Sequence, residues 1–198
     1  MNSITLKAHV PVGQSGEWNI ERFTVSAEDA KFDELRAAVQ GMQGRPYIPV
    51  KPGEYTKLKR GCKLVMSDTP AEVVSLRTLY NIAEGDVLIN GLGLGIAPHA
   101  LSKKPEITSI TVIEISPDVI RLVAPYLGDK VKVILGDAFS WKPPKGVVYG
   151  AVWHDIWDNI TSDNLLEMTK LRRKYARRCK WQGCWAYSDC LRVKRCWG

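Results

Sequence analysis

The sequence predicts an α/β fold built on a parallel sheet, and two observations support this. The apolar run 86–90 breaks into the pattern G-x-G-x-G at 91–95, as a buried strand does where it turns sharply into a helix. Three further strand-length apolar runs lie at 110–115, 131–138 and 147–155, and the segments between them suit helices and loops. Strands that alternate with helices are typical of parallel sheets.

The N-terminal part, residues 1–66, is predicted to be a β-rich cover that belongs to the same domain. Apolar and polar residues alternate at 4–6 and 23–25, which favours short strands. The segment 27–42 has apolar residues at helical spacing.

The predicted α/β core spans residues 67–160. Ser67 or Asp68 could cap its first helix, which would continue through Leu79. The core strands are those introduced above, and we expect their carboxyl ends to meet at one edge of the sheet, where open α/β folds bind ligands.

Residues 161–198 are predicted to form a basic helix and a tail rich in Cys and Trp. Apolar residues at helical spacing favour one helix over 161–180, and a short strand is expected at 184–187. The sheet should therefore be truncated after its fourth or fifth strand.

The glycine loop predicts a nucleoside site. Glycine at positions 91, 93 and 95 allows positive φ and the close approach of a ligand to bare backbone. A helix beginning at Ile96 would direct its free N–H groups toward that ligand. Glu114 follows Gly95 by 19 residues, the distance at which such folds hydrogen-bond a ribose. A glycine-rich turn without any ligand is the alternative.

The spacing of the glycines disfavours a dinucleotide. The fingerprint G-x-G-x-x-G needs a third glycine where Ile96 stands. The loop instead resembles that of class I methyltransferases dependent on S-adenosylmethionine (SAM). The runs 131–138 and 147–155 resemble the third strand with its acidic loop, and the fourth strand, of that family.

This resemblance implies SAM as the cofactor and assigns roles to particular residues. Asp137 would hold the adenine amino group, and Asp155 would stand beside the point of transfer. The residues implied in cofactor binding are Asn90, Gly91, Leu92, Gly93, Gly95, Glu114, Ile115, Asp137, Ala138 and Asp155.

Two departures from the family pattern modify the expectation. Ile89 stands where such methyltransferases usually carry an acid, and in this the loop is similar to the spermidine synthase branch, which uses decarboxylated SAM. The segment 53–72 is similar to the hairpin and helix start of that branch. Its aspartate-rich signature is missing, because residues 154–159 read HDIWDN. The whole chain resembles small methyltransferase-like proteins encoded by phages.

The implied mechanism is direct methyl transfer, in which the protein aligns the reactants and removes a proton. Asp155 is the candidate proton acceptor, with Asp158 or His154 in reserve and Trp157 as a wall of the pocket. Neighbours on a strand point to opposite faces, so at most one of His154 and Asp155 faces the ligand. The alternatives are that Asp155 caps a turn and that Trp157 packs in the core.

Charge is concentrated in the C-terminal part. The chain has a formal net charge of +7, and residues 170–198 hold ten Lys and Arg against one Asp. Together with nearby Trp181, Trp185, Tyr187 and Trp197, these residues could bind phosphates and stack bases of a nucleic acid. The alternative, which is the outcome we expect, is that these residues form a helix face exposed to solvent.

The remaining features indicate a cytoplasmic protein that needs no metal. Apolar stretches are only strand-length, and no signal-peptide pattern follows Met1. Four of the five cysteines lie within 179–196 without C-x2-C pairs, which favours free thiols over a zinc site.

Three functions follow from the sequence. We expect a SAM-dependent methyltransferase whose acceptor and oligomeric state the sequence leaves open. A spermidine synthase-like aminopropyltransferase and a non-catalytic binding protein with the same fold are the alternatives.

Overall fold

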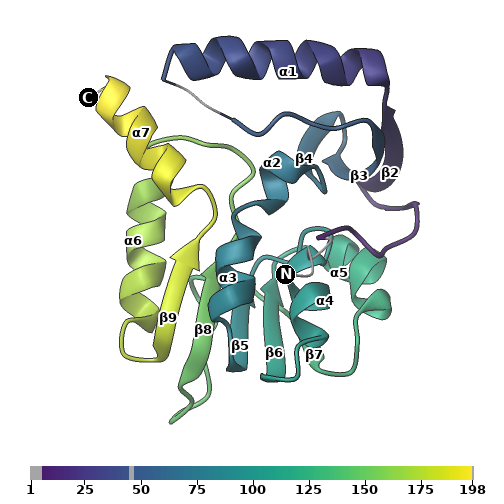
Figure 1. Ribbon diagram of the computed structural model, residues 1–198. Coiled ribbons are helices and arrows are strands. Elements are labelled where there is room, and N and C mark those ends of the chain that lie inside the picture. Colours follow the sequence, from purple (N-terminus) through teal and green to yellow (C-terminus); the bar gives the residue numbers. More distant parts are fainter. Residues whose placement is uncertain (1–5, 45–46, 198) are drawn as a thin grey trace.

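The computed structural model describes residues 6–44 and 47–197, which form two sheets (Figure 1). The larger sheet has five parallel strands in the order β7-β6-β5-β8-β9. These strands are β5 (Gly85–Asn90), β6 (Ile107–Glu114), β7 (Val131–Leu135), β8 (Tyr149–His154) and β9 (Cys179–Cys184). The order is Rossmann-like and confirms the predicted fold class, with a fifth strand present.

Both faces of this sheet are covered by helices, because its strand residues are apolar on both sides. Val87 and Ile89 of β5 join the large core formed with α3, α4 and α5, whereas Leu88 packs with Tyr175 of α6 on the other face. The helices are α3 (Leu76–Ile82), α4 (Ile96–Ser102), α5 (Pro117–Val123), the 3-10 turn η1 (Ala124–Tyr126), α6 (Asn164–Tyr175) and α7 (Tyr187–Trp197).

The N-terminal part forms a second, antiparallel sheet in the order β1-β2-β3-β4. Its strands are β1 (Gly13–Ser15), β2 (Trp18–Val25), β3 (Gly53–Arg60) and β4 (Lys63–Ser67). Ile20 and Leu58 of this sheet are buried in the same core as the larger sheet. Helix α1 (Ala27–Met42), which lies across the top of Figure 1, has the bounds that the sequence predicts and begins with a capping box at Ser26.

The prediction of one continuous helix capped by Ser67 or Asp68 is wrong, both in the capping residue and in the continuity of the helix. Thr69 stands at the N-cap of a short helix, α2 (Pro70–Val73), and α3 follows as a separate helix. Asp68 is buried and its carboxylate accepts the backbone N–H groups of Ala8 and Thr56, at 3.1 and 2.8 Å. Asp68 therefore joins the N-terminal chain to β3 and is not free to cap a helix.

The single helix predicted over 161–180 is also wrong. Helix α6 ends at Tyr175, which is fully buried, and the chain then turns back so that β9 pairs in parallel with β8. In place of the strand predicted at 184–187 the structure has β9, which begins five residues earlier, at Cys179. Helix α7, which was not predicted, follows it.

Two other predictions fall partly on residues that the structure does not describe. Ile4 and Thr5, in the strand expected at 4–6, lie outside the described residues, as do the side chains of Cys196 and Trp197. Among the helices that the structure describes, none combines the length and apolar character needed to span a membrane.

Candidate active site

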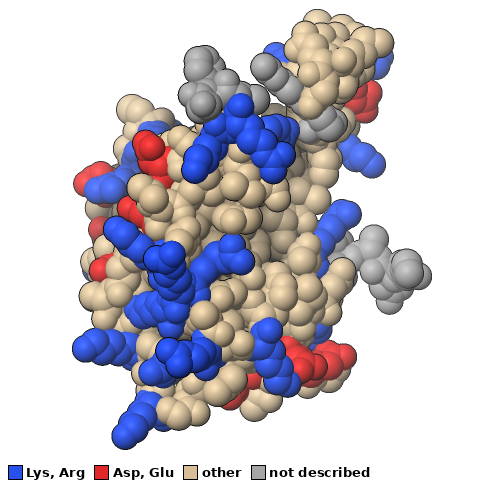
Figure 2. All heavy atoms as spheres, turned by 90° about the vertical axis from the view of Figure 1, so that its left-hand side faces the viewer, with Lys and Arg blue, Asp and Glu red and all other residues tan. Residues whose placement is uncertain are grey.

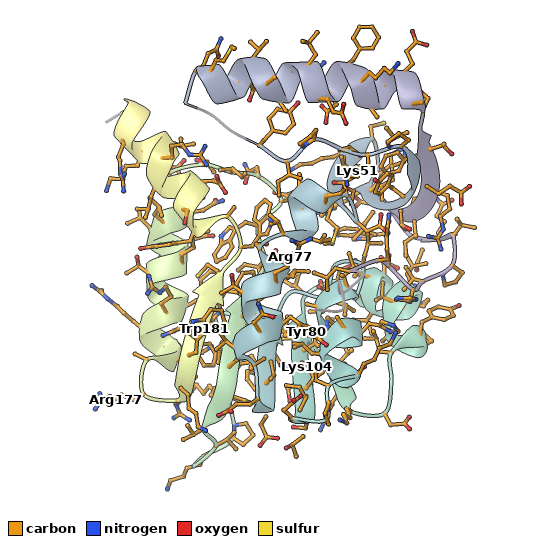
Figure 3. The ribbon with its side chains drawn as sticks, viewed as in Figure 1. Lys51, Arg77, Tyr80, Lys104, Arg177 and Trp181 are labelled. Carbon is orange, nitrogen blue, oxygen red and sulfur yellow. The ribbon has the colours of Figure 1, made fainter. Side chains whose placement is uncertain are left out.

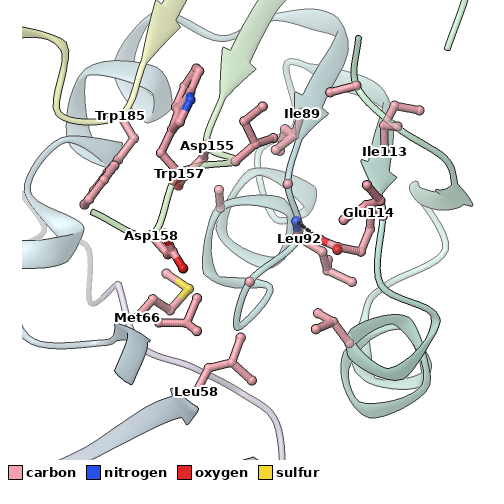
Figure 4. Close-up of a pocket in the computed structure, with 18 of the residues that line it drawn as sticks. Leu58, Met66, Ile89, Leu92, Ile113, Glu114, Asp155, Trp157, Asp158 and Trp185 are labelled. Carbon is pink, nitrogen blue, oxygen red and sulfur yellow. Dashed lines mark hydrogen bonds between the residues drawn. The ribbon is translucent and has the colours of Figure 1, made fainter. Parts of the chain in front are cut away.

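A cavity of about 370 Å³ lies at the carboxyl ends of β5, β6 and β8 (Figure 4). The strand order changes direction between β5 and β8, so the connections leaving these two strands diverge and open a crevice. Leu58 and Met66 of the N-terminal sheet line the cavity as well. The site is thus assembled from both sheets.

Most of the residues predicted from the sequence line this one cavity. They are Gly91, Leu92, Gly93, Glu114, Ile115, Asp137, Ala138 and Asp155. Asn90 and Gly95 do not line it, and their predicted role in cofactor binding stays a prediction. Asn90 is fully buried and its side-chain amide lies 2.8 Å from His154 Nδ1, on the far face of the sheet.

Glu114, at the end of β6, is held by two backbone N–H groups. One carboxylate oxygen accepts from Leu92 in the glycine loop and the other from Ser116, both at 2.8 Å. Only 8% of the residue is exposed, yet it borders the cavity. Each oxygen of a carboxylate can accept a second hydrogen bond. Glu114 can therefore hold its loop and still accept a ligand hydroxyl.

Asp137 is fixed in a turn after β7. Its carboxylate accepts the backbone N–H groups of Phe139 and Ser140, at 3.0 and 3.3 Å. Lys174 of α6 supports the same turn, because its ammonium group donates to the carbonyls of Ala138, Phe139 and Trp141. The turn carries both Asp137 and Ala138 to the edge of the cavity.

The three glycines of the loop have positive φ, but the space beside each is filled by protein. An added Cβ would lie 1.8 Å from the Asp155 carbonyl at Gly91, 2.3 Å from Met66 Sδ at Gly93, and 2.7 Å from a Val123 methyl at Gly95. The predicted close approach of a ligand to Gly91 and Gly93, which line the cavity, stays a prediction. These glycines permit close packing of the chain on itself.

Asp155 and His154 point to opposite sides, as strand geometry requires. Asp155 faces the cavity, with Oδ2 3.4 Å from Trp153 Nε1. Burial raises the pKa of Asp155 to about 7, while the Trp153 N–H lowers it and the charge of Glu72 raises it by smaller amounts. His154 is fully buried and burial lowers its pKa to about 4, so the structure does not bring it to the cavity.

The two remaining predicted side chains also line the cavity. Asp158 forms an ion pair with Lys63 at 2.5 Å, on the rim of the site. Trp157 is 9% exposed and donates its indole N–H to Glu167 at 2.7 Å. Trp157 thus serves at once as a wall of the cavity and as part of a small apolar cluster.

Among the residues that line the cavity but were not predicted from the sequence are Met66, Glu72 and Trp185. Met66 Sδ accepts the N–H of Leu94 at 3.1 Å, which joins β4 to the glycine loop. Their positions depend on how β4, α2 and the segment after β9 pack against the core. The density of Trp in the C-terminal part was a signal for Trp185, whereas no local pattern marked Glu72.

Lys and Arg side chains gather on one face, the basic face, which Figure 2 shows and which is the left-hand side of Figure 1, where α6, α7 and β9 lie. Arg177 and Arg178 lie in the turn after α6 and Lys180 lies in β9, which corrects their predicted place on one helix. Several of the charges already have partners. Lys180 pairs with Glu84 at 2.8 Å, and Arg172 lies 5.0 Å from the ring centre of Tyr187. Arg177 points outward at the lower end of α6 (Figure 3).

The described cysteines, Cys62, Cys179, Cys184 and Cys190, are free thiols. Burial raises the pKa of Cys184 to about 12, which makes it unreactive as a thiolate. Within 6–44 and 47–197, no group of three His, Cys, Asp or Glu side chains could hold a metal ion.

Comparisons with known proteins find similarity in structure but not in sequence families. No protein-family model matches the chain, and no curated protein matches it. The N-methyltransferase NodS from Bradyrhizobium japonicum WM9 matches 54% of this chain with 13% identity and a TM-score of 0.43. The complex of DhpI with S-adenosylhomocysteine (SAH) matches 54% of this chain with 25% identity and a TM-score of 0.41.

A third structure is PH1948 from Pyrococcus horikoshii, a candidate RNA methyltransferase. It matches 63% of this chain with 16% identity and a TM-score of 0.46. The matches cover 59% of NodS, 50% of DhpI and 64% of PH1948. The chain thus matches between half and two-thirds of the length of these proteins.

Proposed function

We propose that this protein is a SAM-dependent methyltransferase of the class I fold. The observation that carries the proposal is the arrangement of Glu114 beside the glycine loop, at the point where the strand order reverses. This is where a Rossmann-like sheet binds a nucleoside, and an acidic residue at the end of the second strand is suited to ribose hydroxyls.

The residues present fit a SAM-sized nucleoside. Glu114 would accept the ribose hydroxyls, and the turn at Asp137 and Ala138 would border the adenine. Ile115, which is 69% exposed, would offer an apolar surface to one face of the base. When bound, SAM supplies a methyl group on a sulfonium, which is already activated for transfer.

Asp155 would receive the proton that the acceptor loses. Its pKa of about 7 places it between the two protonation states at neutral pH, the range in which a carboxylate is an effective general base. Its backbone N–H donates to the Asn90 carbonyl at 2.8 Å, so Asp155, which follows β8, is fixed beside the end of β5. Asp158 is a weaker candidate because Lys63 neutralises it.

Decarboxylated SAM remains the alternative donor because Ile89, not an acid, lines the cavity before the loop. Nucleic acid is the alternative partner for a non-catalytic role, since Arg173, Arg177 and Arg178 border a shallow hollow on the basic face. We place the protein in the cytoplasm.

Calorimetric titration with SAM, decarboxylated SAM and S-adenosylhomocysteine (SAH) tests the proposal. We expect SAM and SAH to bind, and Asp155→Asn to keep nearly normal SAH affinity while the rate of transfer falls. Absence of binding by all three nucleosides would refute the proposed function. Tighter binding of decarboxylated SAM than of SAM would favour the aminopropyltransferase alternative.

A further inference from the structure

We infer that the acceptor is an amine, which enters the cavity as its ammonium ion and binds between Glu72 and Asp155. The inference rests on the proposed methyltransferase function and names the substrate class for that same site. It is carried by two independent features of the cavity, its unbalanced charge and its aromatic walls.

The cavity is strongly acidic. Its lining includes six carboxylate residues and one cationic residue, Arg60, whose guanidinium already pairs with Glu17 at 3.0 Å. The six are Glu72, Glu114, Asp137, Asp155, Asp158 and Glu167. Such a lining disfavours an acceptor with a net negative charge and attracts a cationic one.

Four of these carboxylates have partners within the protein. Glu114 and Asp137 accept backbone N–H groups, Asp158 pairs with Lys63, and Glu167 accepts the Trp157 indole N–H. These four are therefore fixed in place by the fold, and their charges are partly compensated.

Glu72 and Asp155 have weaker partners. In the described part of the chain neither forms an ion pair, Asp155 accepts only the distant Trp153 indole N–H, at 3.4 Å, and Glu72 accepts a backbone hydrogen bond from Ser67. Glu72 comes from the first turn of α2 and Asp155 from the end of β8, so two separate elements bring them to one cavity. Burial raises the pKa of both, and the charge of Glu72 raises that of Asp155 further. Two neighbouring carboxylates without a counterion favour the binding of a cation.

Aromatic rings point to the same ligand chemistry. Trp18, Trp157 and Trp185 line the cavity, and Figure 4 shows Trp157 and Trp185 beside Asp155. The face of an indole ring attracts ammonium groups, more strongly when the site is partly shielded from water. A neutral alcohol would gain neither this attraction nor the pairing with the two carboxylates.

The chemistry of transfer to an amine balances at these residues. The ammonium ion loses one proton to the Asp155 carboxylate, which frees the nitrogen lone pair. That pair forms a bond to the methyl carbon as the carbon–sulfur bond breaks, and the electrons of the broken bond remain on sulfur. The product is an N-methylammonium ion, which Glu72 still compensates, and Asp155 later releases its proton to water.

The cavity volume also limits the size of the acceptor. A volume of about 370 Å³ lies near the lower end of the range for ligand pockets, about 300–1,000 Å³, and the donor must share it. A slim aliphatic amine suits the remaining space, so 1,4-diaminobutane is the probe and uncharged 1,4-butanediol its matched control.

The experiment is a two-step calorimetric titration at pH 7.5, first with SAH and then with the probe on the SAH-loaded protein. We expect 1,4-diaminobutane to bind and 1,4-butanediol not to. Glu72→Gln should weaken the diamine about tenfold or more, the effect of losing a charged partner, while SAH affinity changes less than about threefold. Glu106→Gln removes an exposed carboxylate outside the cavity and should change neither affinity.

The outcomes separate the inference from the proposed function. If SAH itself does not bind, the methyltransferase proposal fails. If SAH binds but the diamine binds no better than the diol, the amine inference alone is overturned. If Glu72→Gln weakens SAH as much as the diamine, the carboxylates serve the amino group of the donor, and the inference is again overturned.

Discussion

The carboxylate of Glu114 accepts the backbone N–H of Leu92 at 2.8 Å and so joins the end of β6 to the glycine loop after β5. Its second oxygen accepts the N–H of Ser116, at the start of α5. The residue expected to bind a ribose therefore also holds together the three segments that shape the site. Loss of its charge should affect the ligand and the fold at the same time.

Glu114→Gln should lower SAH affinity at least tenfold and destabilise the protein by about 1–3 kcal/mol, because an amide NH₂ would face a backbone N–H. Calorimetry and urea unfolding measure the two effects. The exposed Glu106→Gln is the control. Normal SAH affinity in a folded Glu114→Gln protein would show that Glu114 does not contact the nucleoside.

Gly91→Ala should prevent stable folding, because its Cβ would lie 1.8 Å from the Asp155 carbonyl at a φ of 96°. Gly61→Ala is the matched control, since Gly61 also has positive φ but no atom lies within 4 Å of the added Cβ. The control should cost only about 1–2 kcal/mol. Thermal unfolding compares them, and equal losses would contradict the packing argument.

Asp155 should make stability fall as pH rises. Its folded pKa of about 7 exceeds the usual 3.8, so between these values the folded protein binds one more proton than the unfolded chain. The stability gained from the neutral carboxyl is complete below about pH 4 and is lost as pH approaches 7.

Asp155→Asn removes this titration. Relative to the variant, the wild type should lose on the order of 2 kcal/mol between pH 4 and 7, a value reduced by screening from the water that reaches the cavity. Urea unfolding at pH 4, 5, 6 and 7 gives the difference. A constant difference between the two proteins would show that the Asp155 pKa is not raised.

Lys174→Met should loosen the turn that carries Asp137, because three backbone carbonyls would lose their shared donor. We expect a loss of about 1–3 kcal/mol in stability and a severalfold loss in SAH affinity. Lys170, one turn earlier on α6 and exposed, supplies the control Lys170→Met. If both variants bind SAH equally well, Lys174 does not position the site.

The basic face should bind DNA or RNA only weakly at physiological salt. Lys174, Lys180 and Arg192 already have partners, which lowers the number of charges available to neutralise phosphates, and the salt dependence of binding scales with that number. Gel-shift titrations of the wild type and of the double variant Arg173→Gln, Arg177→Gln measure the strength of this binding. A tight complex that the double variant loses would instead support a nucleic-acid partner.

Local patterns in the sequence were sufficient for the core of the fold. The G-x-G-x-G loop, the run before it and Glu114 placed β5, α4 and β6, since short-range spacing determines each. The same reasoning failed over 161–180, where apolar residues at helical spacing favoured one continuous helix. The break after Tyr175 arises because β9 must pair with β8, a contact between distant residues.

The candidate site divides in the same way. Residues at strand ends, such as Glu114 and Asp155, could be predicted because the carboxyl edge of a parallel sheet gathers them. Glu72, Met66 and Trp185 reach the cavity only through packing of separate elements, for which no spacing rule exists. The roles given to the glycines also depended on packing, since Met66 and Asp155 fill the space beside Gly93 and Gly91.

The strand order has a consequence for when the site comes into existence. Strands β5, β6 and β7 are neighbours and follow one another along the chain, whereas β8 and β9 add to the opposite edge of β5. During synthesis the glycine loop and Glu114 therefore emerge before the elements that carry Asp155 and Trp185. A nascent chain can complete this cavity only after its C-terminal strands have docked. The proposed nucleoside, once bound, should then slow amide exchange in β8 and β9 by stabilising the docked state.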